Sequence, residues 1–278
     1  MSNLAIRTLV AVVAIPLILA ACFYGGFFFF LFTTILIVLG TNEFYMLSRA
    51  KNFEPLAVFG ITGAATLNAL VYSSPIPIAY EFITALILFA LLLELFKKRT
   101  DGVKGTFENV GVTITGIVYV GYFGSILTAI RERVGIQNVL PTHRSAGLFI
   151  ISIFAMIWIC DSAAYFVGGA IGRHKMSKFV SPKKSWEGAI AGFVFALLTS
   201  AGCKYWVLPQ LSWHVMLATG LIIGTFGQAG DFVESLFKRD ACAKDSSDMI
   251  PGHGGVLDRF DSLLFSAPLI YMMLQHLR

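Results

Sequence analysis

The sequence has 278 residues, of which 13% are charged and 56% are hydrophobic, and its formal net charge is +5 at pH 7. Soluble globular domains contain about 25% charged residues, so this composition excludes an ordinary soluble domain and indicates a membrane protein. The basic residues lie in short loops between apolar stretches, with no folded module to present them to a duplex. This arrangement argues against nucleic-acid binding.

Apolar stretches follow one another along almost the whole chain. A bilayer core requires about 20 apolar residues per helix, and stretches that are continuous rather than alternating favour helices over a β-barrel. We therefore predict an all-α, polytopic integral membrane protein with about nine transmembrane helices. In chain order the predicted spans are 8–23, 26–48, 56–73, 76–96, 107–130, 146–170, 187–208, 212–237 and 262–277.

Basic residues flank these spans unequally. Of the 21 lysines and arginines, all but five lie on the face that also holds the N-terminus. The five on the opposite face are Arg131, Arg133, Arg144, Lys204 and Arg278. Positive charge gathers on the cytoplasmic side of membrane proteins. The pattern predicts a cytoplasmic N-terminus and a multi-pass protein of the cell's inner (cytoplasmic) membrane.

The cysteines and the N-terminal stretch each allow two interpretations. Cys22, Cys160, Cys203 and Cys242 have no Cys-x-x-Cys spacing, so small buried hydrophobic residues are favoured over disulfides or metal ligands. Residues 7–22 are also typical of a lipoprotein signal peptide that ends at Cys22. The same stretch serves equally well as a first span, and we favour the span.

The two halves of the chain differ in where their charged residues lie. Residues 1–145 form about five phenylalanine-rich predicted spans joined by short turns, whereas residues 146–278 carry acids and bases at the cytoplasmic span ends and are the region where we expect a functional site. Glu43 and Glu81 nevertheless lie within early spans. Ionisable residues inside a membrane are functional candidates by default, so a direct role for either stays open.

The segment from Asp231 to Asp261 is too highly charged to face lipid. Its acids and bases are Asp231, Glu234, Asp240, Asp245, Asp248, Asp258 and Asp261, with Lys238, Arg239, Lys244 and Arg259. Each centrally placed ion costs at least about 2.5 kcal/mol on the insertion scale, so the segment must line water, metal or a polar ligand. Carboxylates interleaved with bases suit a polyphosphate site, because Mg²⁺ binds carboxylates and substrate phosphates while bases neutralise the remaining oxygens.

Asp231 and Asp258 are the acids best placed to bind metal. They lie at the two ends of this segment, close to apolar spans, so a loop folded back on itself would bring both to one cation. The alternative is a structural ion pair with Arg239 or Arg259. The glycines around His253 allow a backbone to approach a ligand closely, or form only a tight turn.

Three blocks of residues in this segment form a distinctive pattern. They are Ser235-x-Phe237-Lys238-Arg239, then Lys244-Asp245-x-Ser247, then Ile250-Pro251-x-His253-Gly254-Gly255-Val256-x-Asp258-Arg259-Phe260-Asp261. This pattern resembles the signature of the phosphatidate cytidylyltransferase (CDP-diacylglycerol synthase) family.

A second polar patch agrees with this resemblance. It comprises Asp161-Ser162-Ala163-Ala164-Tyr165, then Gly168, Gly172, Arg173, His174, Lys175, and Ser181-Pro182-Lys183-Lys184-Ser185-Trp186-Glu187-Gly188. The family shows a similar Asp-containing helix followed by a basic Ser-Pro-x-Lys loop. Asp161 and Tyr165 share one helix face. The two glycines after them fit either helix packing or a nucleotide contact, and the lysine pair could act only as a topology determinant.

The resemblance implies that the phosphate of phosphatidic acid attacks the α-phosphorus of CTP, giving CDP-diacylglycerol and pyrophosphate in a nucleotidyl transfer. We expect this transfer to depend on Mg²⁺, which Asp231 and Asp258 would hold. Residues implied to act on the phosphates, or to orient those that do, are Lys238, Arg239, Lys244, Asp245, His253, Arg259 and Asp261. Residues implied to receive CTP or line its cavity are Asp161, Tyr165, Arg173, Lys175, Ser181, Lys183 and Lys184. The family also allows a second cation and a homodimer.

Two other functions compete with this interpretation. A transporter also carries intramembrane acids and basic loops, but it predicts inverted repeats and paired broken helices, which the sequence does not reveal. A CTP-dependent lipid kinase, or a transferase acting on another lipid phosphate, would use similar residues. The choice between CTP and dCTP and the acyl-chain preference are not specified by the sequence.

Overall fold

The computed structural model describes residues 3–74, 76–97, 104–133, 139–140, 142–252 and 254–276. The helices of the first half are α1 (Asn3–Tyr24), α2 (Gly26–Arg49), α3 (Ala57–Ser73), α4 (Ile76–Leu95), α5 (Thr106–Thr115), the π-helical η1 (Gly116–Tyr122) and α6 (Phe123–Glu132). Those of the second half are α7 (His143–Ile171), α8 (Trp186–Gly202), η3 (Cys203–Val207), α9 (Trp213–Ile222), η4 (Ile223–Gly227), α10 (Gln228–Asp240) and α11 (Leu257–His276).

Each predicted span overlaps one continuous helix of the described residues, which confirms the all-α class. The π-helical segments join their neighbours, so that α9, η4 and α10, for example, form one unbroken helix. Six helices in the described residues are long and apolar enough to cross a membrane. They are Gly26–Arg49, Pro77–Leu95, Thr106–Glu132, His143–Ile171, Trp186–Val207 and Trp213–Asp240. The chain is therefore a multi-pass helical membrane protein.

Capping side chains define where several of these helices begin. Thr142 and Ser145 form a capping box at the start of α7, in which each side chain accepts a hydrogen bond from the other residue's backbone N–H. The Ser185 hydroxyl accepts a hydrogen bond from the Gly188 N–H at 3.3 Å and begins α8 in the same way. These residues are polar interruptions of the apolar sequence, and they set the boundaries of the long helices.

The largest helix–helix contact joins α7 to α8, and glycines make it close. An added Cβ at Gly168 would lie 3.3 Å from the Gly188 Cα and 3.1 Å from the Ser185 hydroxyl. One at Gly188 would lie 2.7 Å from the Ala164 carbonyl oxygen. At Gly168 the structure therefore supports the packing role over a nucleotide contact.

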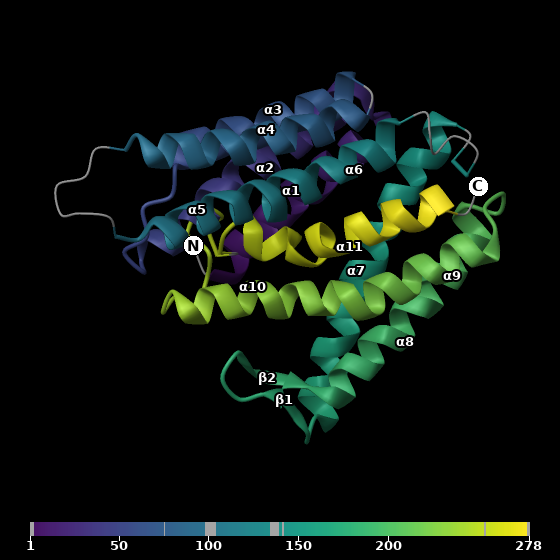
Figure 1. The fold of residues 1–278 in the computed structure, drawn as a ribbon. Helices are drawn as coiled ribbons and strands as arrows, with labels where there is room; N and C mark the ends of the chain where they lie inside the picture. Colours follow the sequence, from purple (N-terminus) through teal and green to yellow (C-terminus); the bar gives the residue numbers. More distant parts are fainter. Residues whose placement is uncertain are drawn as a thin grey trace.

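The basic loop after α7 forms an antiparallel hairpin, a feature that the sequence analysis did not predict. Its strands are β1 (Lys175–Ser177) and β2 (Ser181–Ser185), paired with Lys175 opposite Ser185 and Ser177 opposite Ser181. Figure 1 shows α7 and α8 leading away from the other helices and carrying this hairpin at their ends, while α10 and α11 run side by side. The hairpin thus lies near α10 rather than within the helical core.

Candidate active site

Helices α7, α10 and α11 bring four carboxylates together. Asp261 of α11 is buried and interacts electrostatically with Asp231, Glu234 and Asp161. Asp161 of α7 interacts in turn with Asp231 and with the guanidinium of Arg259. We call Asp161, Asp231, Glu234 and Asp261 the acid cluster. Three of its members and Arg259 were predicted as site residues, so the fold unites positions that lie up to 100 residues apart in sequence.

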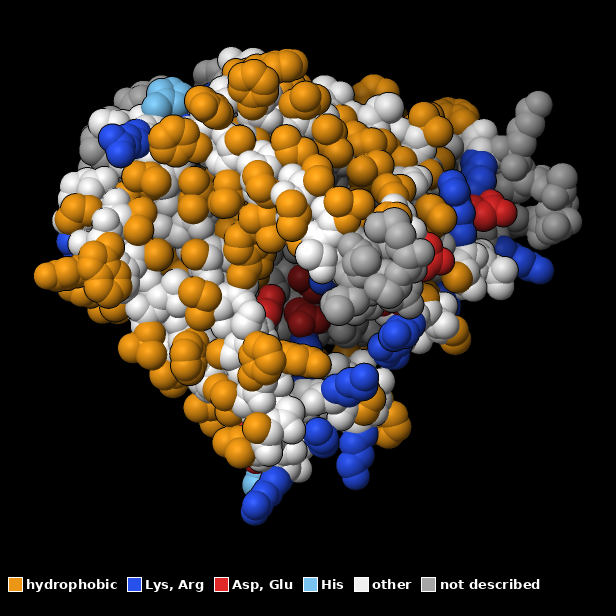
Figure 2. Space-filling model, turned by 180° about the vertical axis from the view of Figure 1, so that it is seen from behind, with side chains coloured by type: hydrophobic (Ala, Val, Ile, Leu, Met, Phe, Trp, Pro, Cys, Tyr) orange, Lys and Arg blue, Asp and Glu red, His pale blue; other side chains and the backbone are white. Residues whose placement is uncertain are grey.

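The molecular surface is hollowed on a face that is otherwise largely hydrophobic. Figure 2 shows Asp and Glu side chains inside this hollow and Lys and Arg side chains along its lower edge. Within the acid cluster Asp161 is exposed and the Asp231 side chain is 35% exposed, whereas Glu234 and Asp261 are buried. Grouped negative charge beside low-dielectric walls attracts cations strongly.

Two lysines neutralise much of this negative charge. The Lys238 ammonium is buried between Glu234 and Asp258, forming ion pairs with both, and it lies 2.5 Å from Asp258 Oδ1. The Lys184 ammonium lies 2.5 Å from Asp231 Oδ2 and 4.2 Å from the centre of the Phe232 ring. The ion pairs that the sequence analysis assigned to Arg239 or Arg259 as an alternative are therefore made by lysines.

The hairpin separates two adjacent lysines that the sequence could not distinguish. Successive residues of a strand point to opposite faces, and on β2 Lys184 turns toward Asp231 while Lys183 is exposed. Arg239 ties the hairpin to α10, because its Nε donates to the Val180 carbonyl oxygen at 3.3 Å. Only Lys184 of the pair reaches the acid cluster.

Asp258 joins the start of α11 to the loop of residues 241–256, which we call the polar loop. Its Oδ2 accepts hydrogen bonds from the Ser246 N–H at 2.8 Å, the Ser246 hydroxyl at 2.9 Å and the Gly255 N–H at 2.8 Å. With Lys238 on its other oxygen, this carboxylate links α10 and α11 to Ser246 in the polar loop and to Gly255 near its end. The loop thus folds back onto Asp258, whereas a cation shared by Asp231 and Asp258 stays a prediction.

Glu43 of α2 is the contributor whose role the sequence left open. Its side chain is completely buried, and its two oxygens accept hydrogen bonds from the polar loop and from the start of α11. The sequence indicated Glu43 only as an acid inside an apolar span. It did not reveal the hydrogen-bond partners of Glu43, which lie more than 200 positions away. Glu81, the other acid left open, is an exposed residue of α4.

The remaining predicted residues lie around this centre at different depths. Exposed positions are Arg173, Lys175, Arg239, Lys244 and Asp245, and Ser181 is half-buried on β2. Tyr165 is 76% exposed and packs edge-on against Phe166, with 5.4 Å between ring centres. His253 lies outside the described residues, so its predicted role stays a prediction.

A comparison with known families decides what kind of protein this is. The model of the cytidylyltransferase family matches residues 5–277, nearly the whole chain. The chain belongs to the cytidylyltransferase family. Its members are nucleotidyltransferases, so this chain is an enzyme of that class, as the motifs of the polar segment predict.

Curated relatives of this cytidylyltransferase agree over almost their full lengths. A phosphatidate cytidylyltransferase of Synechocystis sp. is 33% identical over 285 residues, covering 95% of this chain and 94% of the relative. One from Staphylococcus aureus is 30% identical over 272 residues, covering 97% and 98%. One from Bacillus subtilis is 32% identical over 247 residues, covering 86% and 87%. The likeness therefore extends well beyond the signature segment.

Carboxylate oxygens, which are hard donors, gather at this site of the cytidylyltransferase. In the described part of the chain, no three Asp, Glu, His or Cys side chains are arranged to hold a metal ion by themselves. Both Glu234 oxygens are buried and accept no hydrogen bond there, apart from the Lys238 ion pair. Mg²⁺ commonly uses one or two carboxylates together with substrate phosphates and water, and these residues suit that mode.

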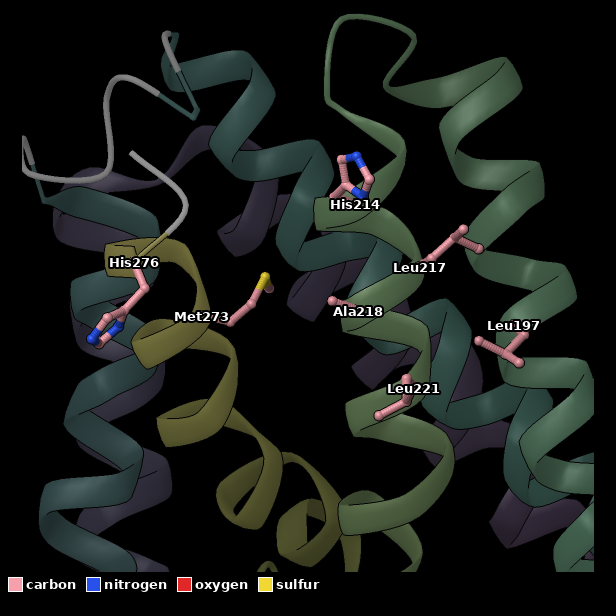
Figure 3. A pocket seen from close by; sticks show the side chains of 7 residues that line it. All are labelled: Leu197, His214, Leu217, Ala218, Leu221, Met273 and His276. Carbon is pink, nitrogen blue, oxygen red and sulfur yellow. The ribbon is translucent and has the colours of Figure 1, made fainter.

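An apolar groove lies elsewhere and is not part of this site. Figure 3 shows its lining side chains, which come from α8, α9 and α11 and are Leu197, His214, Leu217, Ala218, Leu221, Met273 and His276. Leu217 and Asp231 are 14 residues apart on one continuous helix, a distance of roughly 20 Å. None of the predicted site residues lines the groove.

Proposed function

We propose that this chain is a phosphatidate cytidylyltransferase, which joins CTP to phosphatidic acid and gives CDP-diacylglycerol and pyrophosphate. The observation that carries the proposal is the meeting of the acid cluster with Lys184, Lys238 and Arg259 in an otherwise apolar protein. The names of its relatives, at 30–33% identity, support the same substrates. The nucleotidyltransferase class is common to both arguments.

The proposed reaction requires charge compensation more than acid or base catalysis. A phosphate oxygen of phosphatidic acid forms a bond to the α-phosphorus of CTP, and the bond from that phosphorus to the α–β bridging oxygen breaks. Pyrophosphate leaves with those electrons. The attacking phosphate is already an anion, so no proton has to be removed from it. Because both reactants are anions, the protein must lower their repulsion and align them in line.

Basic residues of α10, the polar loop and α11 act on the triphosphate in this proposal. Lys238, Arg239, Lys244 and Arg259 stabilise the phosphate oxygens and the departing pyrophosphate, and Asp245 and Asp261 orient these bases. His253 donates to a phosphate oxygen. Lys238 is the one best fixed before substrate arrives, because two carboxylates already hold its ammonium. Preorganised charge of this kind needs little rearrangement during the reaction.

Asp231 and Asp258 hold Mg²⁺ in this proposal. The ion supplies Lewis-acid stabilisation of phosphate oxygens when it is bound. One oxygen of each carboxylate contacts a lysine ammonium, Lys184 for Asp231 and Lys238 for Asp258. The same oxygens therefore already accept positive charge, which supports their use as cation ligands. A second cation and a homodimer are compatible with this scheme.

The membrane arrangement we propose has about nine crossings, a cytoplasmic N-terminus, and the hairpin and polar loop at the inner face of the cytoplasmic membrane. The hollow that Figure 2 shows in the hydrophobic face would then open toward the bilayer. Phosphatidic acid could keep its acyl chains in the lipid while its headgroup enters sideways. CTP would reach the same site from the cytoplasm, past the hairpin.

The fate of labelled CTP tests this function against its rivals. Purified protein in bilayers that contain phosphatidic acid and Mg²⁺ receives CTP labelled either in cytosine or at the γ-phosphate. We expect the cytosine label, and not the γ-phosphate label, to enter the lipid extract. Incorporation of γ-phosphate label alone would indicate a lipid kinase. If neither label entered the lipid, the proposal would be overturned.

The two adjacent lysines of β2 offer a matched test of the hairpin. Replacing Lys184 with alanine removes the cation held against Asp231, so we expect kcat/KM for CTP to fall about 10-fold, the effect of one charge-assisted hydrogen bond. Replacing the exposed Lys183 with alanine should change it less than about threefold, since a solvated charge contributes little. Initial rates with purified variants measure both. Equal losses for the two lysines would contradict the assignment.

A further inference from the structure

Glu43 is a carboxylate of α2 that is buried beside the polar loop. Its side chain has no exposed surface, and its neighbours include the apolar residues Phe44, Val256 and Leu257. A buried charge is strongly unfavourable unless hydrogen bonds compensate it. The hydrogen bonds that compensate the Glu43 carboxylate therefore indicate its role.

Four donors share its two oxygens evenly. Oε1 accepts from the Ser247 hydroxyl at 2.6 Å and the Val256 N–H at 2.9 Å. Oε2 accepts from the Leu257 N–H at 2.7 Å and lies 3.1 Å from the Ser246 hydroxyl, whose one proton it shares with Asp258. Each oxygen thus contacts one serine hydroxyl of the polar loop and one backbone N–H at the start of α11. Negative charge at a helix N-terminus is also favourable.

These contacts continue directly to Asp258. The Ser246 hydroxyl lies within hydrogen-bond distance of both carboxylates, at 3.1 Å from Glu43 Oε2 and 2.9 Å from Asp258 Oδ2. Gly255 packs so closely that an added Cβ would lie 2.6 Å from Glu43 Oε2. A shift of Glu43 would therefore move the residues that hold Asp258, and with it the ammonium of Lys238.

We propose that Glu43 is a positioning residue for the reaction: from α2 it fixes the middle of the polar loop and the start of α11, and thereby sets the place of Asp258 and Lys238. The proposal rests on the proposed function, since its kinetic readout is formation of CDP-diacylglycerol. It gives the first half of the chain a specific task in a site whose other described members lie between residues 161 and 261.

The main test replaces Glu43 with glutamine and separates kcat from KM. In wild type the Val256 and Leu257 N–H groups each donate to one Glu43 oxygen. Glutamine replaces one of these oxygens with an NH₂ group, which cannot accept, so one of the two backbone hydrogen bonds is lost. We expect kcat to fall roughly 10- to 100-fold, about 1.4 to 2.8 kcal/mol, while KM for CTP changes less than about threefold. A kcat that stays within about twofold of wild type would overturn the proposal.

Glu94→Gln is the matched control. Glu94 is equally buried in the first half of the chain, but it lies 3.5 Å from Asn109 of α5 and not beside the polar loop. We expect its kcat to stay within about threefold of wild type. An equal fall in both variants would overturn the proposal, because it would show a general effect of neutralising a buried acid.

Two further measurements keep the outcome decisive. Hydrogen exchange, which needs no activity, should show faster exchange of the Val256 and Leu257 amides in Glu43→Gln, and unchanged exchange would overturn the positioning role.

If that variant does not fold, Ser247→Ala removes one donor to Glu43 and should lower kcat about threefold or more at unchanged KM. An unchanged kcat would overturn the proposal. Wild-type protein that forms no CDP-diacylglycerol would reject the proposed function. If Glu43→Gln still showed faster exchange at Val256 and Leu257, the role of Glu43 in positioning the loop would stand.

Discussion

Replacing Asp231 with asparagine is expected to lower the rate of CDP-diacylglycerol formation by about 10³-fold, the upper range for loss of one preorganised electrostatic group. Asparagine keeps the size of the side chain but removes the charge that faces Lys184 at 2.5 Å. It also removes the more accessible of the two proposed Mg²⁺ ligands. We therefore expect the residual rate to require at least about 10-fold more Mg²⁺ for half-saturation.

Asp240→Asn is the control for this prediction. Asp240 lies on the same helix and pairs with Lys51 at 3.1 Å, but its side chain is 65% exposed. Exposed ion pairs contribute little, so we expect near-normal rates and Mg²⁺ dependence. Rates are measured over a Mg²⁺ titration on protein that elutes as a single species. Asp231→Asn protein with more than about a tenth of the wild-type rate would remove Asp231 from the chemistry.

The Asp258→Asn variant is expected to lose about 10²- to 10³-fold in turnover for a different reason. Its carbonyl oxygen can still accept from Ser246 and Gly255, which keeps the polar loop anchored, but its NH₂ group now faces the Lys238 ammonium. Lys238 then retains only Glu234 as a charged partner. We expect the ammonium to shift away from the phosphates while the protein still folds.

Asp248→Asn, an exposed acid of the same loop, is the control for the Asp258 variant and should keep more than about half of the wild-type rate. Thermal unfolding in detergent measures whether either variant is destabilised. The assignment of Asp258 fails if its variant turns over within about fivefold of wild type while remaining folded.

The helices were predictable because a continuous run of about 20 apolar residues satisfies its backbone in lipid as a helix, whereas a barrel strand would alternate. Where a polar residue mattered, the prediction was less sharp: the last span was expected from residue 262, yet α11 begins at Leu257. Hydrogen bonds from its first N–H groups to Glu43 extend the helix through the charged residues that precede the apolar run. These bonds join α2 to α11 and leave no local signal.

The site was predictable as a set of residues but not as a set of contacts. Charge density in an apolar chain indicated the polar segment, and the positions of Asp231 and Asp258 beside the flanking apolar spans made them the predicted metal ligands. Which base faces which acid depends on the strand alternation of the hairpin, which turns Lys184 inward, and on helix register, which places Lys238 beside Glu234 one turn away. Lys, Ser and Pro are not typical strand formers, so the hairpin itself gave no clear signal.

The central claim is that the triphosphate of CTP binds where α10, α11 and the hairpin meet. A CTP derivative with a photoreactive group on its γ-phosphate tests it most directly, with purified protein in bilayers and mass spectrometry of the labelled peptides. We predict labelling within residues 228–261 and within the hairpin segment 173–185, and protection by excess CTP. Labelling confined to the apolar groove of α8, α9 and α11, or labelling that CTP does not reduce, would contradict the account.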